Sequence, residues 1–179
     1  MKKSLLGVAV CLLISLPVLA ALKVGDMAPD FSARGSLAGK EFDFSLQDAL
    51  KKGPVVVYFF PSAYTKGCDL EAHTFAQEKD KFDAAGATII GVSADKIDVL
   101  DKFSTADCQS KFALAADPEL KVAKSYDSVL TKMLGYADRT SYVIAPNGKI
   151  LYAYSAMDPD KHVENTLAAV EKWRAAHKG

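Results

Sequence analysis

Residues 55–68 read VVVYFFPSAYTKGC, and this stretch decides the fold. Its first six residues are all β-branched or aromatic, and they lie between Pro54 and Pro61. A continuous apolar run without polar alternation is typical of a strand that is buried on both faces in the middle of a sheet. The sequence therefore predicts a central strand that ends before Pro61, followed by a loop and then a helix.

Helices and strands alternate after this strand. Apolar side chains at helical spacing predict a helix over residues 69–85, which Gly86 ends. Short apolar segments predict strands over 87–92, 112–115, 141–145 and 149–154, the last two joined by a Pro-Asn-Gly turn. Further helices are expected to begin at Asp95, at Asp117-Pro118 and at Asp158-Pro159.

The order β-α-β-α-β-α-β-β-α implies parallel crossovers, and the closing hairpin makes the sheet mixed. Residues 22–50 are expected to add short strands or a hairpin before it. We therefore expect the α/β class, as a thioredoxin-like three-layer sandwich with a mixed sheet and an N-terminal β extension. The element order also suits other three-layer folds.

The N-terminus has the pattern of a secretory signal. Two lysines precede an apolar run over residues 5–16, and Val-Leu-Ala follows, ending at Ala20. We expect a signal peptide over 1–20, one domain over 21–179, and export to the periplasm. The alternative is an uncleaved membrane anchor. Cleavage would remove Cys11 and leave two cysteines.

The charge balance excludes one class of partner. Lys plus Arg and Asp plus Glu each number 22, so the chain has no basic field that would hold nucleic acid. His73, His162 and His177 are scattered without metal-ligand spacing. No metal and no cofactor is therefore predicted.

Cys68 and Cys108 remain after cleavage, as a structural disulfide or as a redox pair. Cys68 is expected at or just inside a helix N-terminus, where free N–H groups and the helix dipole favour a thiolate. Thr65 lies three residues upstream, close enough for its hydroxyl to turn toward the sulfur. The alternative is that Cys68 is a small buried hydrophobic residue.

The spacing Pro61-x-x-x-Thr65-x-x-Cys68 resembles the P-x-x-x-T-x-x-C signature of peroxiredoxins. Three further stretches resemble the bacterioferritin-comigratory (Q-type) branch of that family: Asp69-Leu70-Glu71-Ala72, Gly91-Val92-Ser93-Ala94-Asp95 and Arg139-Thr140-Ser141-Tyr142-Val143-Ile144. The resemblance extends over about residues 24–155.

This resemblance implies a thiol-dependent peroxidase that reduces hydrogen peroxide and organic hydroperoxides. Cys68 would be the peroxidatic cysteine and become a sulfenic acid. Thr65 and Arg139 would hydrogen-bond the thiolate and the peroxide oxygens, and Pro61 would shield the pocket from water. The alternative for Arg139 is a surface salt bridge with Asp138. A thioredoxin-like or glutathione-type thiol would be the reductant, and the chain would be a monomer or a weak dimer.

The chain departs from that branch at His73, where many members carry a resolving cysteine. Cys108 is the remaining candidate, with a one-cysteine enzyme or a passive Cys108 as alternatives. Rival functions lack their motifs. A thiol–disulfide oxidoreductase needs C-x-x-C, but position 65 is Thr, and a copper-binding factor needs a cysteine four residues away, where Tyr64 and Ala72 stand. A redox-inert scaffold on the same fold is the last alternative.

Overall fold

The computed structural model describes residues 21–131 and 135–177, so the expected signal peptide lies outside the described residues. Seven strands form one mixed sheet in the order β2-β1-β5-β4-β3-β8-β9. Its strands are β1 (Ser32–Leu37), β2 (Lys40–Ser45), β3 (Val55–Phe59), β4 (Thr88–Ser93), β5 (Ala113–Ala116), β8 (Thr140–Ile144) and β9 (Ile150–Ser155). Two short strands, β6 (Val129–Thr131) and β7 (Tyr136–Ala137), pair separately.

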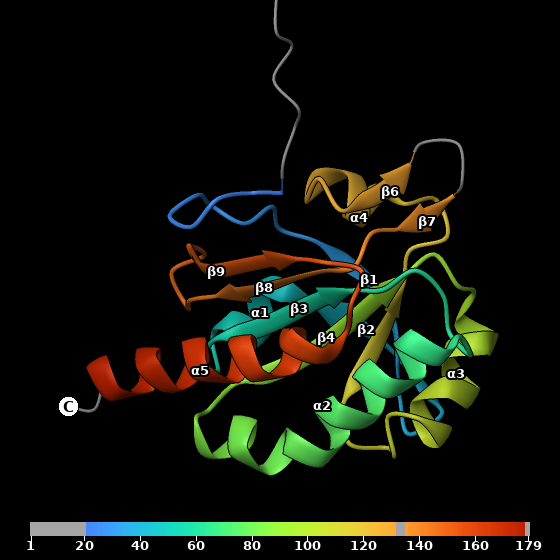
Figure 1. The fold of residues 1–179 in the computed structure, drawn as a ribbon, viewed down its shortest axis with the longest axis horizontal. Coiled ribbons are helices and arrows are strands. Elements are labelled where there is room, and N and C mark those ends of the chain that lie inside the picture. The colour runs from blue at the N-terminus through green and yellow to red at the C-terminus, as the bar shows by residue number, and fades with distance from the viewer. Residues whose placement is uncertain (1–20, 132–134, 178–179) are drawn as a thin grey trace, which may run out of the picture.

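Helices cover both faces of this sheet. Figure 1 shows α2 (Lys66–Ala84), α3 (Ile97–Ala106) and α5 (Asp160–Ala176) against one face, with α1 (Leu46–Leu50) and α4 (Lys121–Ser125) completing the set. The core accordingly divides into two clusters, one under α2, α3 and α5 and the other under α1 and α4. This arrangement confirms the predicted three-layer, thioredoxin-like sandwich.

The central strand β3 is buried along its whole length, as its sequence predicts. Val56 and Tyr58 point into the α2 cluster, whereas Val57 and Phe59 point into the α1 cluster. This alternation follows from the two-residue period of a strand. β3 runs parallel to β4 and antiparallel to β8, so it lies in the interior of the sheet.

Several expected element starts differ in the structure. α2 begins at Lys66, three residues before the predicted start, so Cys68 lies inside its first turn. α3 begins at Ile97 with Lys96 at its N-cap, and Asp95 is not the cap. α4 begins at Lys121, and the carboxylate of Asp117 accepts hydrogen bonds from the backbone of its first turn across an intervening turn.

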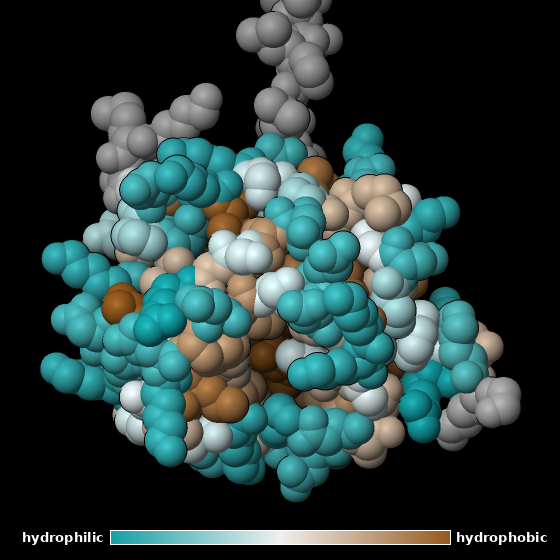
Figure 2. All heavy atoms as spheres, turned by 180° about the vertical axis from the view of Figure 1, so that it is seen from behind, coloured by the Kyte–Doolittle hydropathy of each residue, from teal (hydrophilic) through white to brown (hydrophobic). Residues whose placement is uncertain are grey.

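The outer surface is mainly polar. On the face seen in Figure 2, hydrophilic side chains surround a smaller central area of apolar residues. Among the described residues, no helix is both long enough and apolar enough to cross a membrane.

Candidate active site

Cys68 is the third residue of α2, directly after the loop that leaves the central strand. Thr65 is the N-cap of this helix, and its carbonyl accepts the first helical bond from Asp69 N at 2.9 Å. The preceding N–H groups of the first turn therefore have no partner within the helix. The Cys68 side chain is 2 % exposed and belongs to the apolar cluster under α2. The predicted position at a helix start is confirmed.

Arg139, which directly precedes β8, contacts Cys68 through its guanidinium. Its Nη2 donates to Cys68 Sγ at 3.2 Å, and its Nε donates to the Met157 carbonyl at 3.0 Å. The residue is 3 % exposed, and Asp138 binds only its backbone N–H. The alternative of a surface salt bridge with Asp138 is therefore wrong.

The strand register explains how residues 71 positions apart meet. β8 pairs antiparallel with β3, and Thr140 lies opposite Phe59. Arg139 immediately precedes Thr140, and the loop to Cys68 begins immediately after Phe59. The end of β3 and the beginning of β8 thus deliver both side chains to one edge of the sheet.

Glu71 is a third buried member of the site that the sequence did not identify. Its side chain is fully buried and forms an ion pair with Arg139 Nη1 through Oε2. Burial raises the pKa of Glu71 to about 8 against the opposing effect of Arg139. A sequence signal does exist, because residues three apart on a helix share a face and Glu71 follows Cys68 by three.

His162 on α5 lies behind Glu71, with Nδ1 3.7 Å from Glu71 Oε1. Its Nε2 lies 2.9 Å from the Ala156 carbonyl and its Nδ1 lies 2.8 Å from Ser141 Oγ. Burial lowers the pKa of His162, which favours the neutral ring. Within residues 21–131 and 135–177, no three His, Cys, Asp or Glu side chains gather as a metal site.

The loop between β3 and α2 is held by Asp95. Its carboxylate accepts hydrogen bonds from Ala63 N at 2.8 Å and from Ser62 Oγ at 3.2 Å. Asp95 was expected to cap α3 and instead fixes the loop that contains the half-buried Pro61. Thr65 is exposed, and its hydroxyl donates to the Ser62 carbonyl at 2.9 Å rather than to the sulfur.

Cys108 follows the end of α3 and is fully buried, with a free thiol like that of Cys68. Both sulfurs belong to the same apolar cluster. Burial raises the pKa of the Cys108 thiol well above its ordinary range, and the neighbouring Asp107 carboxylate adds to this effect. Cys108 is therefore a protonated thiol in this arrangement.

Two side-chain contacts hold the segment after Cys108 against α2. Gln109 contacts the exposed ring of His73 at 3.1 Å, and Lys111 Nζ donates to the Ala76 carbonyl at 3.0 Å. Gln109 and Ser110 both have left-handed backbones, with φ of 51° and 60°. Non-glycine residues pay about 1 kcal/mol or more for that conformation.

Comparison with known proteins places this site in a family context. The sequence matches the AhpC/TSA family over residues 24–153. It is 33% identical over 152 residues to a chloroplastic peroxiredoxin Q of Oryza sativa subsp. japonica, covering 82% of this chain and 66% of that protein. It is 30% identical over 154 residues to a putative peroxiredoxin bcp of Helicobacter pylori (strain J99), covering 83% and 98% of the two chains.

Solved structures give the same picture. Peroxidoxin BcpB from Mycobacterium tuberculosis superposes with a TM-score of 0.77 at 28% identity, covering 84% of this chain and 97% of that one. The chain thus spans just under two thirds of the rice relative and nearly the full length of the other two proteins.

Proposed function

Because this chain belongs to the AhpC/TSA family and is a peroxiredoxin, a thiol-dependent peroxidase, we propose that Cys68 is the sulfur that attacks the hydroperoxide. The observation that carries this proposal is the hydrogen bond from Arg139 Nη2 to Cys68 Sγ at 3.2 Å, in a buried setting at a helix start. A fixed cationic donor beside a sulfur favours the thiolate, which is the nucleophilic form.

In the proposed reaction the thiolate attacks one peroxide oxygen. An S–O bond forms, the O–O bond breaks, and Cys68 becomes a sulfenic acid. Negative charge builds on the leaving oxygen, where the Arg139 guanidinium is available to stabilise it. The Thr65 hydroxyl already donates to the Ser62 carbonyl, so its lone pairs can accept the O–H of an incoming hydroperoxide. Pro61 would limit access of water.

Cys108 is the proposed resolving cysteine. It is buried as a protonated thiol, so it can attack the sulfenic acid only after its segment opens. The two consecutive left-handed residues that follow it favour such opening, because unwinding releases their backbone strain. A thioredoxin-like or glutathione-type thiol would then reduce the resulting disulfide between Cys68 and Cys108.

We further propose that hydrogen peroxide and organic hydroperoxides are both substrates. The signal pattern of residues 1–20 supports export to the periplasm, and we propose a monomer or weak dimer as the working form.

The test is peroxide turnover with a generic dithiol, in the wild type and in Cys68→Ser and Cys108→Ser. We expect Cys68→Ser to lose all turnover, because a hydroxyl does not ionise near neutral pH. Retained turnover in that variant would refute the assignment of Cys68.

Mass spectrometry after one equivalent of peroxide then tests Cys108. A disulfide between Cys68 and Cys108 within one chain supports the resolving role. A stable sulfenic acid on Cys68 with Cys108 still free would instead establish a one-cysteine enzyme.

A further inference from the structure

Two acidic groups share one guanidinium in the buried site. Arg139 donates through Nη2 to Cys68 and through Nη1 to Glu71. Both acidic residues and the arginine are at most 3 % exposed. If Cys68 and Glu71 were both anions, the site would carry one uncompensated negative charge away from water, which is costly.

His162 does not supply the missing positive charge. The Ala156 carbonyl can only accept, so His162 Nε2 carries a proton and donates to it at 2.9 Å. Ser141 Oγ lies 2.8 Å from Nδ1, where its hydroxyl can donate to a neutral ring. The imidazole is thus satisfied as a neutral group, and its 3.7 Å separation from Glu71 Oε1 is too long for a hydrogen bond.

The second oxygen of Glu71 has no partner. Within the described part of the chain, Oε1 is buried and accepts no hydrogen bond. An ionised carboxylate with one bare oxygen in the core is unfavourable, whereas a carboxylic acid carries its proton there at less cost.

We propose that Glu71 holds a proton while Cys68 is a thiolate, and that it gives up this proton when Cys68 is oxidised. This inference rests on the proposed role of Cys68. Oxidation removes the negative charge from sulfur, so Arg139 is left to Glu71 alone and stabilises the carboxylate. Glu71 is then a positioning residue that acts through Arg139 and also stores the proton.

The step balances in atoms and charge. The Cys68 thiolate, hydrogen peroxide and the Glu71 carboxylic acid become the sulfenic acid, water and the Glu71 carboxylate. Sulfur is oxidised by two electrons as the O–O bond is reduced, and the proton from Glu71 neutralises the leaving hydroxide in the net reaction. No external proton is needed.

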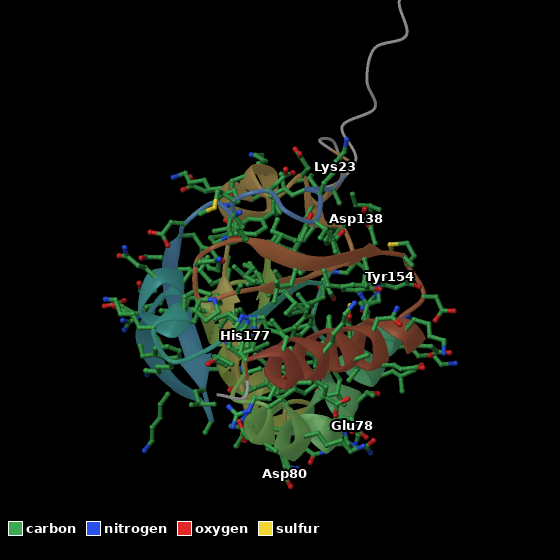
Figure 3. All side chains as sticks on the ribbon, turned by 90° about the vertical axis from the view of Figure 1, so that its left-hand side faces the viewer. Lys23, Glu78, Asp80, Asp138, Tyr154 and His177 are labelled. Atoms are coloured by element: carbon green, nitrogen blue, oxygen red, sulfur yellow. The ribbon has the colours of Figure 1, made fainter. Side chains whose placement is uncertain are left out.

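Other charges around this cluster do not supply a second cation. The groups that face Glu71 and His162 come from β3, the β7–β8 connection, β9 and the β9–α5 connection: Tyr58, Asp138, Arg139, Tyr154 and Asp158. Among them only Arg139 is positive. The Tyr154 ring packs edge-on against the His162 ring, with 4.8 Å between the ring centroids, beside the N-terminal part of α5 (Figure 3).

The test counts protons during a single oxidation. Reduced Cys108→Ser protein, which stops at the sulfenic acid, receives one equivalent of hydrogen peroxide in weak buffer with a pH indicator. We expect Cys108→Ser/Glu71→Gln to draw about one more proton from solution per oxidised Cys68 than Cys108→Ser does. Equal uptake by the two proteins would overturn the proposal.

Two further variants locate the proton. Glu78→Gln is the matched control, because Glu78 is a second α2 carboxylate that is partly exposed and paired with Lys81, and the variant should behave as Cys108→Ser does (Figure 3). His162→Gln keeps a donor and an acceptor, and it should also leave the proton count unchanged. If His162→Gln instead drew the extra proton, the proton would lie on the imidazole and the assignment to Glu71 would be wrong.

An infrared measurement needs no substitution at Glu71. Oxidation of Cys108→Ser should remove the carbonyl stretch of one buried carboxylic acid, and a band that persists would overturn the proposal. Quantifying the sulfenic acid by mass spectrometry separates the two failures. Absence of oxidised Cys68 would count against its role as the attacking sulfur, whereas oxidised Cys68 with unchanged Glu71 counts against this inference alone.

Discussion

Arg139→Lys tests the central contact of the site while it retains the positive charge. The arginine makes three contacts at once, to Cys68 Sγ at 3.2 Å, to the Met157 carbonyl at 3.0 Å and to Glu71. A single ammonium cannot reproduce this planar set of donors. We expect a lysine ammonium to keep only part of this set and to lose the fixed, directed contact to sulfur.

The loss of one donor aimed at developing charge costs about 2.7–4 kcal/mol, so the second-order rate constant with hydrogen peroxide should fall about 100-fold to 1000-fold. Stability should fall by only about 1–3 kcal/mol, because the positive charge stays in the site and the loss is limited to unmade hydrogen bonds. Arg139→Ala is a poorer choice, since it leaves the buried Cys68 and Glu71 without their cationic partner, and breaking a buried ion pair costs about 3–5 kcal/mol.

The rate constant is measured by rapid quench and mass spectrometry of Cys68, with circular dichroism and thermal melting as checks on folding. Arg34→Lys is the control, because Arg34 also contacts two acceptors, Glu41 and Asp43, but is half exposed. A folded Arg139→Lys protein that reacts within about threefold of the wild-type rate would refute the role of the guanidinium.

Three further predictions concern Glu71 and two glycines. Burial raises the pKa of native Glu71 from 4.5 to about 8, so between these pH values the folded protein keeps a proton that the unfolded chain has released. The free energy of unfolding should therefore fall by about 1.4 kcal/mol for each pH unit as the pH rises from about 4.5 to about 8. Urea unfolding should show this slope in the wild type, and an equal slope in Glu71→Gln would contradict it. Gly67→Ala places a methyl 3.2 Å from Arg139 Nη2, so the peroxide rate should fall about 10-fold without loss of helix stability; an unchanged rate would mean that the guanidinium tolerates displacement. Gly91→Ala places a methyl 2.6 Å from the Tyr58 ring, and thermal melting should show a loss of about 1–3 kcal/mol or more, whereas an unchanged melting temperature would show that the ring can move.

The sequence determined the layer order and the position of the reactive sulfur. The apolar run at residues 55–60 predicted a strand buried on both faces, because it is short, β-branched and aromatic and lies between two prolines. The loop that follows predicted Cys68 at a helix start, since the end of a strand and the start of a helix are both determined by nearby residues. The sequence predicted the first residue of each helix less well. α2 and α4 each begin three or four residues from the predicted position, because several neighbouring polar residues could serve as the N-cap and the geometry of the preceding turn selects one of them.

Only the tertiary structure decided the surroundings of the sulfur. Arg139 could equally have been a surface residue, and pairing of β8 with β3 is what turns it toward Cys68. Glu71 and His162 read as ordinary helix residues, yet both are buried behind the guanidinium. The physical reason is that a charged group is stable in the core only when a partner from a distant segment meets it, and strand order, not local sequence, selects that partner.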